Sequence, residues 1–447
     1  MVSSCAGRVH SPMRRIGGLT HKKMPPSSFY FGPMARAPCA LALLASLLPH
    51  PAAAAAARCV SSPPPSSTPP FVLWNTTASR CERGGGPIDL PDTPARAFLD
   101  ADNATVLVTV DTVARLSRGA SLFSTVRDCT IVHNMTGDPD PAHYAANEFL
   151  DATWSFGNGT IAALLHTEYP GNVYNACSVE PYAWPCCWTV SLSLAVSSDW
   201  GRSWAHASPP PSNLVAAVPY PYESSRTIFG WGDTGGILRD PRDGLFYAAA
   251  YNRMAKGLQP RGTCVMRTAS LLVADSWRGL GSDGRFSVPF ASAYSLPPGT
   301  EGAHVCSTID EAIFPAPCVL YGYVYSLFLE SFVATVNCNQ MAENVGANYT
   351  IYYSTSPDFV HWAPMQLLLH PALEPAWHTN MLTYPALIDP SAPARGDVNF
   401  NTIGQTATLT YVVRTQDFWT YGASLQGVNV TFEKGDGGVS VSAAPRD

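Results

Sequence analysis

Two short segments carry the residues best suited to chemistry, and the first contains Asp92. Proline residues bracket Asp92 in Pro91-Asp-Thr-Pro94 and would hold it rigidly, and Arg96 follows four residues later. An extended strand places Asp92 and Arg96 on one face, where an arginine fork suits a carboxylate or a hydroxyl-rich ligand. The alternatives are structural: an Asx-turn or cap for Asp92, and a salt bridge to Asp92 for Arg96.

The second segment, His166-Thr167-Glu168, ends an apolar run over 161–165. Strand alternation puts His166 and Glu168 on one face, although a histidine at a strand end is often structural. Two carboxyls flanking one bond, one of them with a raised pKa, are the requirement for cleaving a glycoside. If the protein is such an enzyme, Asp92 and Glu168 should share one cavity, with carboxyls about 5–9.5 Å apart and Glu168 the more enclosed.

Two further residues are weaker candidates. Arg267, near Cys264, is interpreted either as a substrate clamp or as a structural arginine beside a disulfide. Asp128, next to Cys129, is a candidate third carboxylate.

Other chemistries lack their signatures. His166-x-Glu168 is followed by Pro185-Cys-Cys187, but position 189 is Thr, so the P-C-x-x-C of zinc deaminases is missing. No H-E-x-x-H, P-loop or G-x-S-x-G motif occurs, which leaves metalloproteases, NTPases and α/β-hydrolases without support. We expect no cofactor.

These residues need a β scaffold, and the sequence provides one. Ser197–Trp204 fits S-x-D-x-G-x-[S/T]-W after the alternating run 188–196. Asp199 would accept backbone N–H bonds, Gly201 would supply a positive φ, and Trp204 would fold back beneath the hairpin. Further short strands are predicted at 104–110, 160–166, 245–251, 319–327, 348–353, 407–413 and 427–432.

A weak repeat indicates the architecture. Thr268–Trp277 and Ser354–Trp362 also leave a Ser/Thr-rich strand and end in tryptophan, so the three tryptophans are 73 and 85 residues apart. Such spacing suits one four-stranded propeller blade. We predict a single all-β propeller over 71–433, with five blades favoured and six, as in sialidases, as the alternative.

Five segments in a single order resemble secreted proteins related to five-bladed propeller glycosidases, the arabinanase, xylosidase and invertase-like enzymes. They are Asp92–Phe98, Leu165–Gly171, Cys264–Thr268, Tyr352–Trp362 and Tyr384–Pro390. The resemblance covers most of 87–415. It implies an Asp of the first blade as base or nucleophile, here Asp92, a Glu of a middle blade as acid, here Glu168, and a further Asp that tunes the acid. It leaves open a central Ca²⁺, which no motif in the sequence supports.

Two alternatives remain beside a glycoside hydrolase. The Ser197–Trp204 segment also resembles the Asp box of sialidases, but Arg96 lacks the x-Pro that follows the N-terminal sialidase arginine. The other alternative is a non-catalytic glycan-binding propeller, which would keep the arginines but lack two facing carboxyls. The expected partner is a carbohydrate or glycoconjugate, and we expect a monomer.

The first 57 residues read as a targeting segment. From Met34, a possible true start, a basic stretch, a short apolar run and small residues form a secretory signal. An organelle transit peptide is the alternative. Residues 58–70 form a Pro/Ser-rich spacer, and 434–447 are expected to be a loose tail. Ten cysteines after residue 57 and six N-x-[S/T] sequons also favour secretion.

The composition indicates which classes of binding partner are disfavoured. With 46% hydrophobic and 13% charged residues, most of the chain can form a large core. Six of the 27 Lys and Arg residues lie in 1–57 and none of the 33 acidic ones does, so the remainder is more acidic than the formal net charge of −6. This charge disfavours nucleic acid and anionic membranes, and no later segment is apolar for long enough to span a bilayer.

Overall fold

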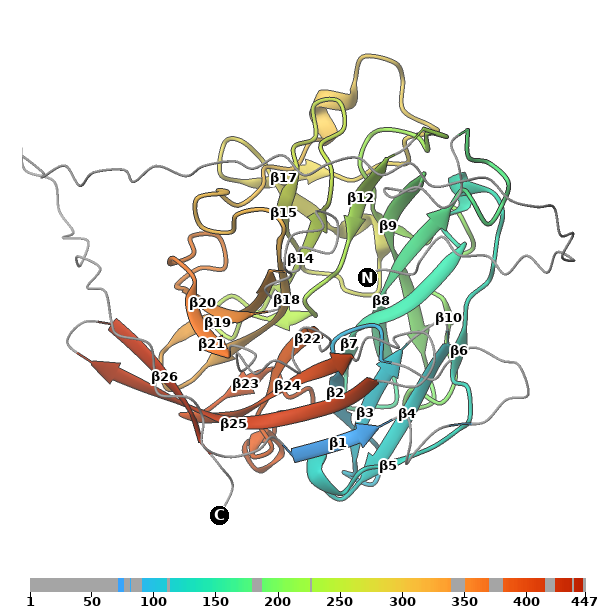
Figure 1. Ribbon diagram of the computed structural model, residues 1–447. Helices are drawn as coiled ribbons and strands as arrows, with labels where there is room; N and C mark the ends of the chain where they lie inside the picture. Colours follow the sequence, from blue (N-terminus) through green and yellow to red (C-terminus); the bar gives the residue numbers. More distant parts are fainter. Residues whose placement is uncertain are drawn as a thin grey trace, which may run out of the picture. The chain divides into compact units, whose positions relative to one another are not determined.

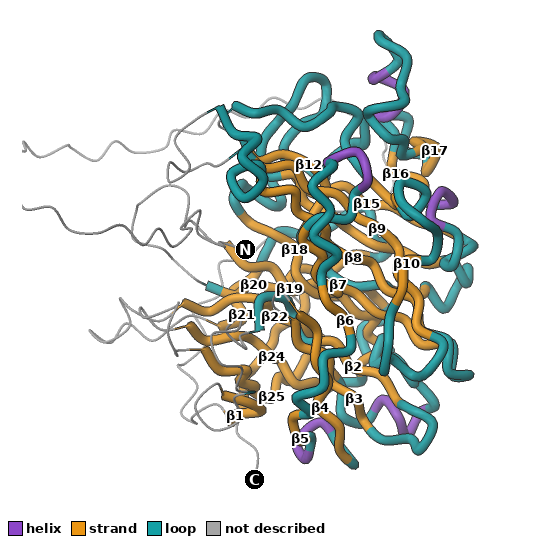
Figure 2. The backbone as a smooth tube through the Cα atoms, turned by 90° about the vertical axis from the view of Figure 1, so that its right-hand side faces the viewer, coloured by secondary structure: helices purple, strands orange, loops and turns teal. Residues whose placement is uncertain are grey.

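The computed structural model describes residues 71–75, 81, 91–110, 113–178, 187–225, 227–338, 350–369, 381–414, 423–435 and 438–444. The predicted targeting segment and spacer lie outside these residues. The described helices are all short 3-10 turns (Figure 2). They are η1 (Leu122–Ser124), η2 (Pro141–His143), η3 (Ala274–Ser276), η4 (Glu301–His304) and η6 (Ala392–Arg395). None of the described helices is long and apolar enough to cross a membrane.

The described strands form five consecutive antiparallel meanders. The first contains β2 (Arg96–Leu99), β3 (Thr105–Val110), β4 (Val113–Gly119), β5 (Val126–Arg127) and β6 (His133–Asn134). The second contains β7 (Asn147–Ser155), β8 (Ile161–Pro170), β9 (Trp188–Ser197), β10 (Ala205–His206) and β11 (Leu214–Ala216). The third contains β12 (Ile228–Gly232), β13 (Leu238–Arg239), β14 (Phe246–Asn252), β15 (Gly262–Thr268), β16 (Arg278–Leu280) and β17 (Phe286–Pro289).

The fourth meander contains β18 (Cys318–Ser326), β19 (Ser331–Cys338), β20 (Ile351–Ser356) and β21 (Gln366–Leu369), with β23 (Thr402–Ile403) parallel to β18. The fifth contains β22 (Met381–Ile388), β24 (Thr406–Arg414), β25 (Ala423–Gly435), β26 (Gly438–Ala444) and β1 (Phe71–Asn75). The inner strands are β2, β7, β12, β18 and β22. A short parallel pairing of β9 with β12 fuses the second and third meanders into one 11-stranded sheet.

Packing between meanders closes the array. Four large buried clusters each join two neighbouring meanders. A fifth cluster joins the fifth meander back to the first and also contains Tyr251 of the third and Val319 and Tyr321 of the fourth. Representative pairs, in order, are Phe98 with Leu165, Leu194 with Trp231, Ala249 with Phe332, Val333 with Leu409, and Leu99 with Ile388. The fold is therefore the predicted all-β propeller, in which every sheet buries both faces against its neighbours.

The turn after β9 has the predicted geometry. Asp199 Oδ1 accepts the Ser203 N–H at 2.9 Å, and Gly201 has a φ of +81°. Trp204 Nε1 donates to the Gly201 carbonyl at 3.0 Å, so the indole folds back over the turn. The turn from Ser356 to Trp362 repeats the pattern, with Trp362 Nε1 donating to the Phe359 carbonyl at 3.1 Å.

The three tryptophan repeats occupy equivalent places. Trp204 lies between β9 and β10, Trp277 between β15 and β16, and Trp362 between β20 and β21. Each position is the connection leading to an outer strand of its meander, in three successive meanders. The repeat therefore marks blades and lies away from the inner strands.

The C-terminal prediction was wrong. Residues 434–447 were expected to be a loose tail, but β25 runs to Gly435 and β26 pairs with it from Asn429↔Ala444 to Gly435↔Gly438. Val439 and Val441 alternate with small residues, and this pattern sustains a strand despite the Gly/Ser/Ala composition. β1 pairs with Ser424–Gly427 of β25, on the same edge as β26 and opposite β24, so the first and last described strands share one sheet (Figure 1).

Four disulfides join described cysteines: Cys81–Cys129, Cys177–Cys187, Cys264–Cys306 and Cys318–Cys338. Because Cys187 pairs with Cys177, it is not bonded to its neighbour Cys186, as predicted from the strain of a vicinal disulfide. Cys59 and Cys186 lie outside the described residues. This use of cysteine is typical of proteins from oxidising compartments.

Candidate active site

Ten polar side chains gather where the inner strands of the meanders meet. We call this group the axial cluster. Its members are Asp92, Arg96, Asp151, His166, Glu168, Asp233, Arg253, Tyr321, Tyr384 and Arg414. Hydrogen bonds, ion pairs or electrostatic interactions link each member to another.

Asp92 is held from the fifth meander. Its Oδ1 accepts the Tyr384 hydroxyl at 3.0 Å and pairs with the Arg414 guanidinium. Arg414 also donates to the Pro91 carbonyl at 3.0 Å and lies over the Tyr384 ring. The side chain of Asp92 is therefore fixed by two donors distant in sequence, rather than by a local Asx-turn.

Arg96 joins the meanders through their main chains. Its Nε donates to the Asp151 carbonyl at 2.9 Å, and its Nη2 donates to the carbonyls of Thr234 and Tyr321 at 3.2 and 3.0 Å. No ion pair between Arg96 and Asp92 is present among the described residues. Arg96 thus belongs to the cluster, but these donors are engaged by carbonyls of the second, third and fourth meanders.

His166 and Glu168 lie side by side on β8, as alternation predicted. His166 Nε2 is 3.3 Å from Glu168 Oε1, and the Asp233 N–H donates to His166 Nδ1 at 2.7 Å. Burial disfavours the His166 cation, but Glu168, Asp233 and Asp151 outweigh it and raise the His166 pKa. The amide at Nδ1 nevertheless requires that nitrogen to be unprotonated, so the hydrogen bonds favour a neutral ring with its proton on Nε2, directed at Glu168.

Asp151 and Asp233 have opposite charge preferences. Burial raises the pKa of Asp151 to about 6, although Arg96 and His166 act against it, and Asp151 Oδ2 accepts the Thr234 N–H at 2.8 Å. Burial also acts on Asp233, but the Arg253 guanidinium, whose Nη2 is 2.7 Å from Asp233 Oδ2, outweighs it and lowers the Asp233 pKa. One acid is thus poised to hold a proton and the other to stay ionised.

Two tyrosines complete the cluster. Tyr321 and Tyr384 are buried with ring centroids 5.3 Å apart in an edge-to-face arrangement. Burial raises the pKa of both phenols, so both stay neutral at working pH. The Tyr384 hydroxyl donates to Asp92.

Two buried carboxylate oxygens have no hydrogen-bond partner among the described residues, Asp151 Oδ1 and Glu168 Oε2. An unsatisfied buried oxygen is costly in a purely structural cluster. These two atoms are the acceptors that the cluster leaves available. Glu168 is 2% exposed and Asp92 8%, so Glu168 is the more enclosed of the two predicted carboxyls.

A segment of the chain spans one end of the axis. Beyond Arg96 the cavity has a volume of about 40 Å³, and Asn399 and Asn401 are among its lining residues. The segment 397–403, called the strap below, bonds to three meanders through Leu99 N to Val398 O, Ser155 N to Asn399 Oδ1 and Tyr325 N to Asn401 O. The strap therefore narrows this end of the axis.

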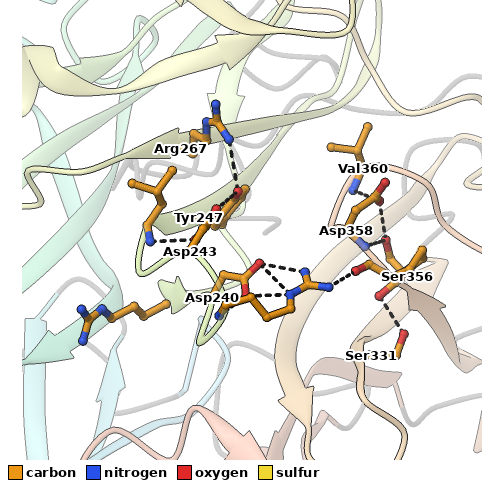
Figure 3. Close-up of polar contacts among 12 residues, drawn as sticks. Asp240, Asp243, Tyr247, Arg267, Ser331, Ser356, Asp358 and Val360 are labelled. Carbon is orange, nitrogen blue, oxygen red and sulfur yellow. Dashed lines mark hydrogen bonds and ion pairs between the residues drawn. The ribbon is translucent and has the colours of Figure 1, made fainter.

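The structure brings together four of the six predicted residues: Asp92, Arg96, His166 and Glu168. Arg267 lies elsewhere, on β15 behind β14, where it donates to the Tyr247 hydroxyl at 3.3 Å and stacks on Phe286 (Figure 3). Asp128 is exposed in a turn and accepts the Thr130 N–H at 2.9 Å. Among the described residues, no hydrogen bond or ion pair joins either residue to the axial cluster.

Sequence reasoning missed six members of the cluster: Asp151, Asp233, Arg253, Tyr321, Tyr384 and Arg414. A signal existed for Tyr384, since Tyr384–Pro390 is one of the segments carrying the family resemblance. Asp233 follows β12 directly and begins Asp-Thr-Gly-Gly, a turn that could have been examined for a strand-end carboxylate. Asp151 lies inside the apolar run Phe149–Ala152 and gave no such signal.

Two acids of the cluster have a cationic partner, because Asp92 and Asp233 are each paired with an arginine. Across the described residues, no group of three or more His, Cys, Asp or Glu side chains could hold a metal ion.

No protein-family model and no curated protein matches the chain. Solved structures with a similar fold include an α-L-arabinanase from Cellvibrio cellulosa in complex with arabinohexaose, at 8% identity and a TM-score of 0.46, covering 80% of this chain and 96% of that one. An α-L-arabinofuranosidase from Lactobacillus brevis has 9% identity and a TM-score of 0.45, covering 78% and 93%. A GH43_1 enzyme from Xanthomonas citri has 14% identity and a TM-score of 0.43, covering 79% and 91%.

Proposed function

We propose that this protein is a secreted glycoside hydrolase that uses two carboxyls of the axial cluster. The observation that carries the proposal is the division of labour among the central acids. Asp92 is anchored as an ion pair by Arg414, whereas burial raises the pKa of Asp151 to about 6 and Glu168 keeps an unpartnered oxygen. An ionised carboxylate and a carboxylic acid around one bond are what glycoside cleavage requires.

In this proposal Asp92 is the base or nucleophile, fixed by Arg414 and Tyr384. Glu168 is the proton donor, with His166 beside it. This mechanism requires the two carboxyls to lie about 5–9.5 Å apart. Asp151 is a second candidate for the donor, because a pKa near 6 keeps a proton available in mildly acidic medium. The ligand enters from the end of the axis opposite the strap.

The test is turnover of a panel of aryl furanosides, pyranosides and sialosides by the full secreted chain. Replacing Asp92 by Asn should lower turnover of every cleaved substrate by about 100-fold or more. Replacing the true proton donor should spare dinitrophenyl glycosides, whose leaving group needs no proton, and abolish turnover of unactivated glycosides. Comparing Glu168→Gln with Asp151→Asn on both substrates therefore identifies the donor.

Asp128→Asn is the matched control, because it removes an exposed carboxyl outside the cluster. If Asp151 is the donor, activity should fall as the pH rises above about 6, since the acid form is lost there. A folded protein that binds glycans but cleaves none of the panel would make it a glycan-binding propeller instead. Equal loss of activity in Asp128→Asn and Asp92→Asn would contradict the assignment of the site.

A further inference from the structure

A second hollow lies at the strap end of the propeller and does not include any member of the axial cluster. It is a cleft of about 770 Å³. Three segments line it: the end of β7 with Phe156, the β13–β14 turn, and the strap with the residue before it, Gly396. We call it the strap cleft.

One wall of the strap cleft is aromatic. Trp154 and Phe246 meet edge to face with ring centroids 5.2 Å apart, and Phe156 extends the wall at 6.5 Å from Phe246. Trp154 and Phe246 are buried, but Phe156 is 38% exposed. The wall therefore ends in a ring that can pack against the apolar face of a ligand.

The charged group of the cleft is preorganised. Arg239 is exposed, its Nε donates to the Gly244 carbonyl at 3.1 Å, and its guanidinium lies over the Phe246 ring at 5.8 Å. No acidic partner is present for it among the described residues. One hydrogen bond and one ring contact thus hold the Arg239 guanidinium in place. Within the described ranges, its Nη1 and Nη2 remain free for a planar bidentate acceptor.

The acids that line the cleft are already engaged. Asp240 pairs with Arg242, whose Nη2 is 2.8 Å from Asp240 Oδ2 (Figure 3). Asp397 accepts from the Asn399 N–H and from both the N–H and the hydroxyl of Thr402. Among the described residues of the cleft, the charged side chain with hydrogen-bonding positions still free is therefore Arg239, a cation.

We propose that the strap cleft binds a saccharide unit bearing a carboxylate, with the carboxylate on Arg239 and the sugar ring against Phe156. A planar carboxylate matches the free edge of a held guanidinium, and the C–H face of a sugar ring packs on an exposed aromatic ring. The choice of a saccharide rests on the proposed function. The choice of an anionic one comes from the cleft alone.

The experiment is calorimetric titration of the full chain with trigalacturonate and with its fully methyl-esterified form, with chromatography to confirm that each probe is recovered intact. Wild-type protein should bind the acid at least tenfold more tightly than the ester. Arg239→Ala should weaken binding of the acid by about tenfold and leave the ester unchanged, since it removes only the charge contact. Phe156→Ala should weaken both.

Arg202→Ala is the matched control, because Arg202 is equally exposed but lies in the turn after β9. Equal affinity for acid and ester, or unchanged binding in Arg239→Ala, overturns the proposal. The two proposals fail separately. Binding through Arg239 without cleavage of any glycoside refutes the hydrolase alone, and cleavage without Arg239-dependent binding refutes the strap cleft alone.

Discussion

The raised pKa of Asp151 makes a quantitative prediction about stability. Burial moves this pKa from 3.8 to about 6, so the folded state holds the proton more tightly than the unfolded state. The stability that this group contributes is fully present below about pH 3.8 and is lost as the pH rises through about 6. A shift of about 2 units corresponds to about 3 kcal/mol, since one unit is about 1.4 kcal/mol.

Asp151→Asn removes the ionisable group, and with it the loss of folding stability as the pH rises. The free energy of unfolding of the variant, relative to wild type, should therefore rise by about 2–3 kcal/mol between pH 4 and pH 7.5. Urea unfolding with the disulfides intact, followed by tryptophan fluorescence at several pH values, measures this difference. Any constant cost of the amide, such as a poorer fit beside Arg96, cancels because only the change with pH is used.

Asp128→Asn tests the sign of the change in stability with pH. Its backbone bond from Thr130 lowers the pKa of Asp128, so this group contributes stability at neutral pH that is lost on acidification. The stability of that variant relative to wild type should fall, not rise, as the pH increases. A difference for Asp151→Asn that stays within 0.5 kcal/mol across the range, or falls with pH, would refute the reasoning that burial dominates this carboxyl.

Two further predictions concern the scaffold. Cys81 follows β1 in the fifth meander, and its disulfide reaches Cys129 in the first. Replacing both cysteines by Ser should lower the free energy of unfolding by about 2–4 kcal/mol. Urea unfolding of the variant and of wild type, both without reductant, measures this difference. Gly201→Ala should lower the free energy of unfolding by about 1–3 kcal/mol more than Gly284→Ala. Both glycines have a positive φ, but a Cβ on Gly201 would lie 2.9 Å from the Phe98 ring, whereas a Cβ on Gly284 would meet open space. Equal melting temperatures for the two glycine variants would contradict this.

The sequence predicted the parts of the fold that local patterns control. The turn at Asp199 follows from the turn chemistry of Asp and Gly, and the tryptophan repeat found the outer connections of three successive meanders. Most predicted strands match described ones within a few residues, because alternation and turn residues act over short distances. The last strand was missed because its small residues resemble a linker, and only its pairing with β25 makes it a strand.

The site was predicted only in part for a physical reason. His166 and Glu168 were found because they follow an apolar run in regular alternation, although β8 does not end there, as expected, but continues to Pro170. Asp151 was missed because it lies where the β7–β8 register shifts between Leu150 and Ala152, and such a bulge turns a residue of an apolar strand toward a new direction. Arg267 was misplaced because a strand pattern does not tell an inner strand from an outer one.

The energetics of the axial cluster favour function over scaffolding. Buried ion pairs such as Asp92–Arg414 and Asp233–Arg253 contribute little net stability, because the desolvation of both charges offsets their attraction. The five apolar clusters between meanders already hold the ring together. Asp199, a structural acid, has hydrogen-bond donors at both carboxylate oxygens. They accept from the Ser197 hydroxyl and from the amide and hydroxyl of Ser203.

In the described part of the chain, two carboxyls of the axial cluster lack such complete hydrogen bonding. Asp151 and Glu168 each keep one buried oxygen without a partner among the described residues, at a cost of about 1–3 kcal/mol for each group. Apolar side chains of similar size would avoid this cost in a propeller whose only task was to fold. The two carboxyls with a free oxygen therefore support the proposed function, in which a substrate arrives from the end of the axis opposite the strap.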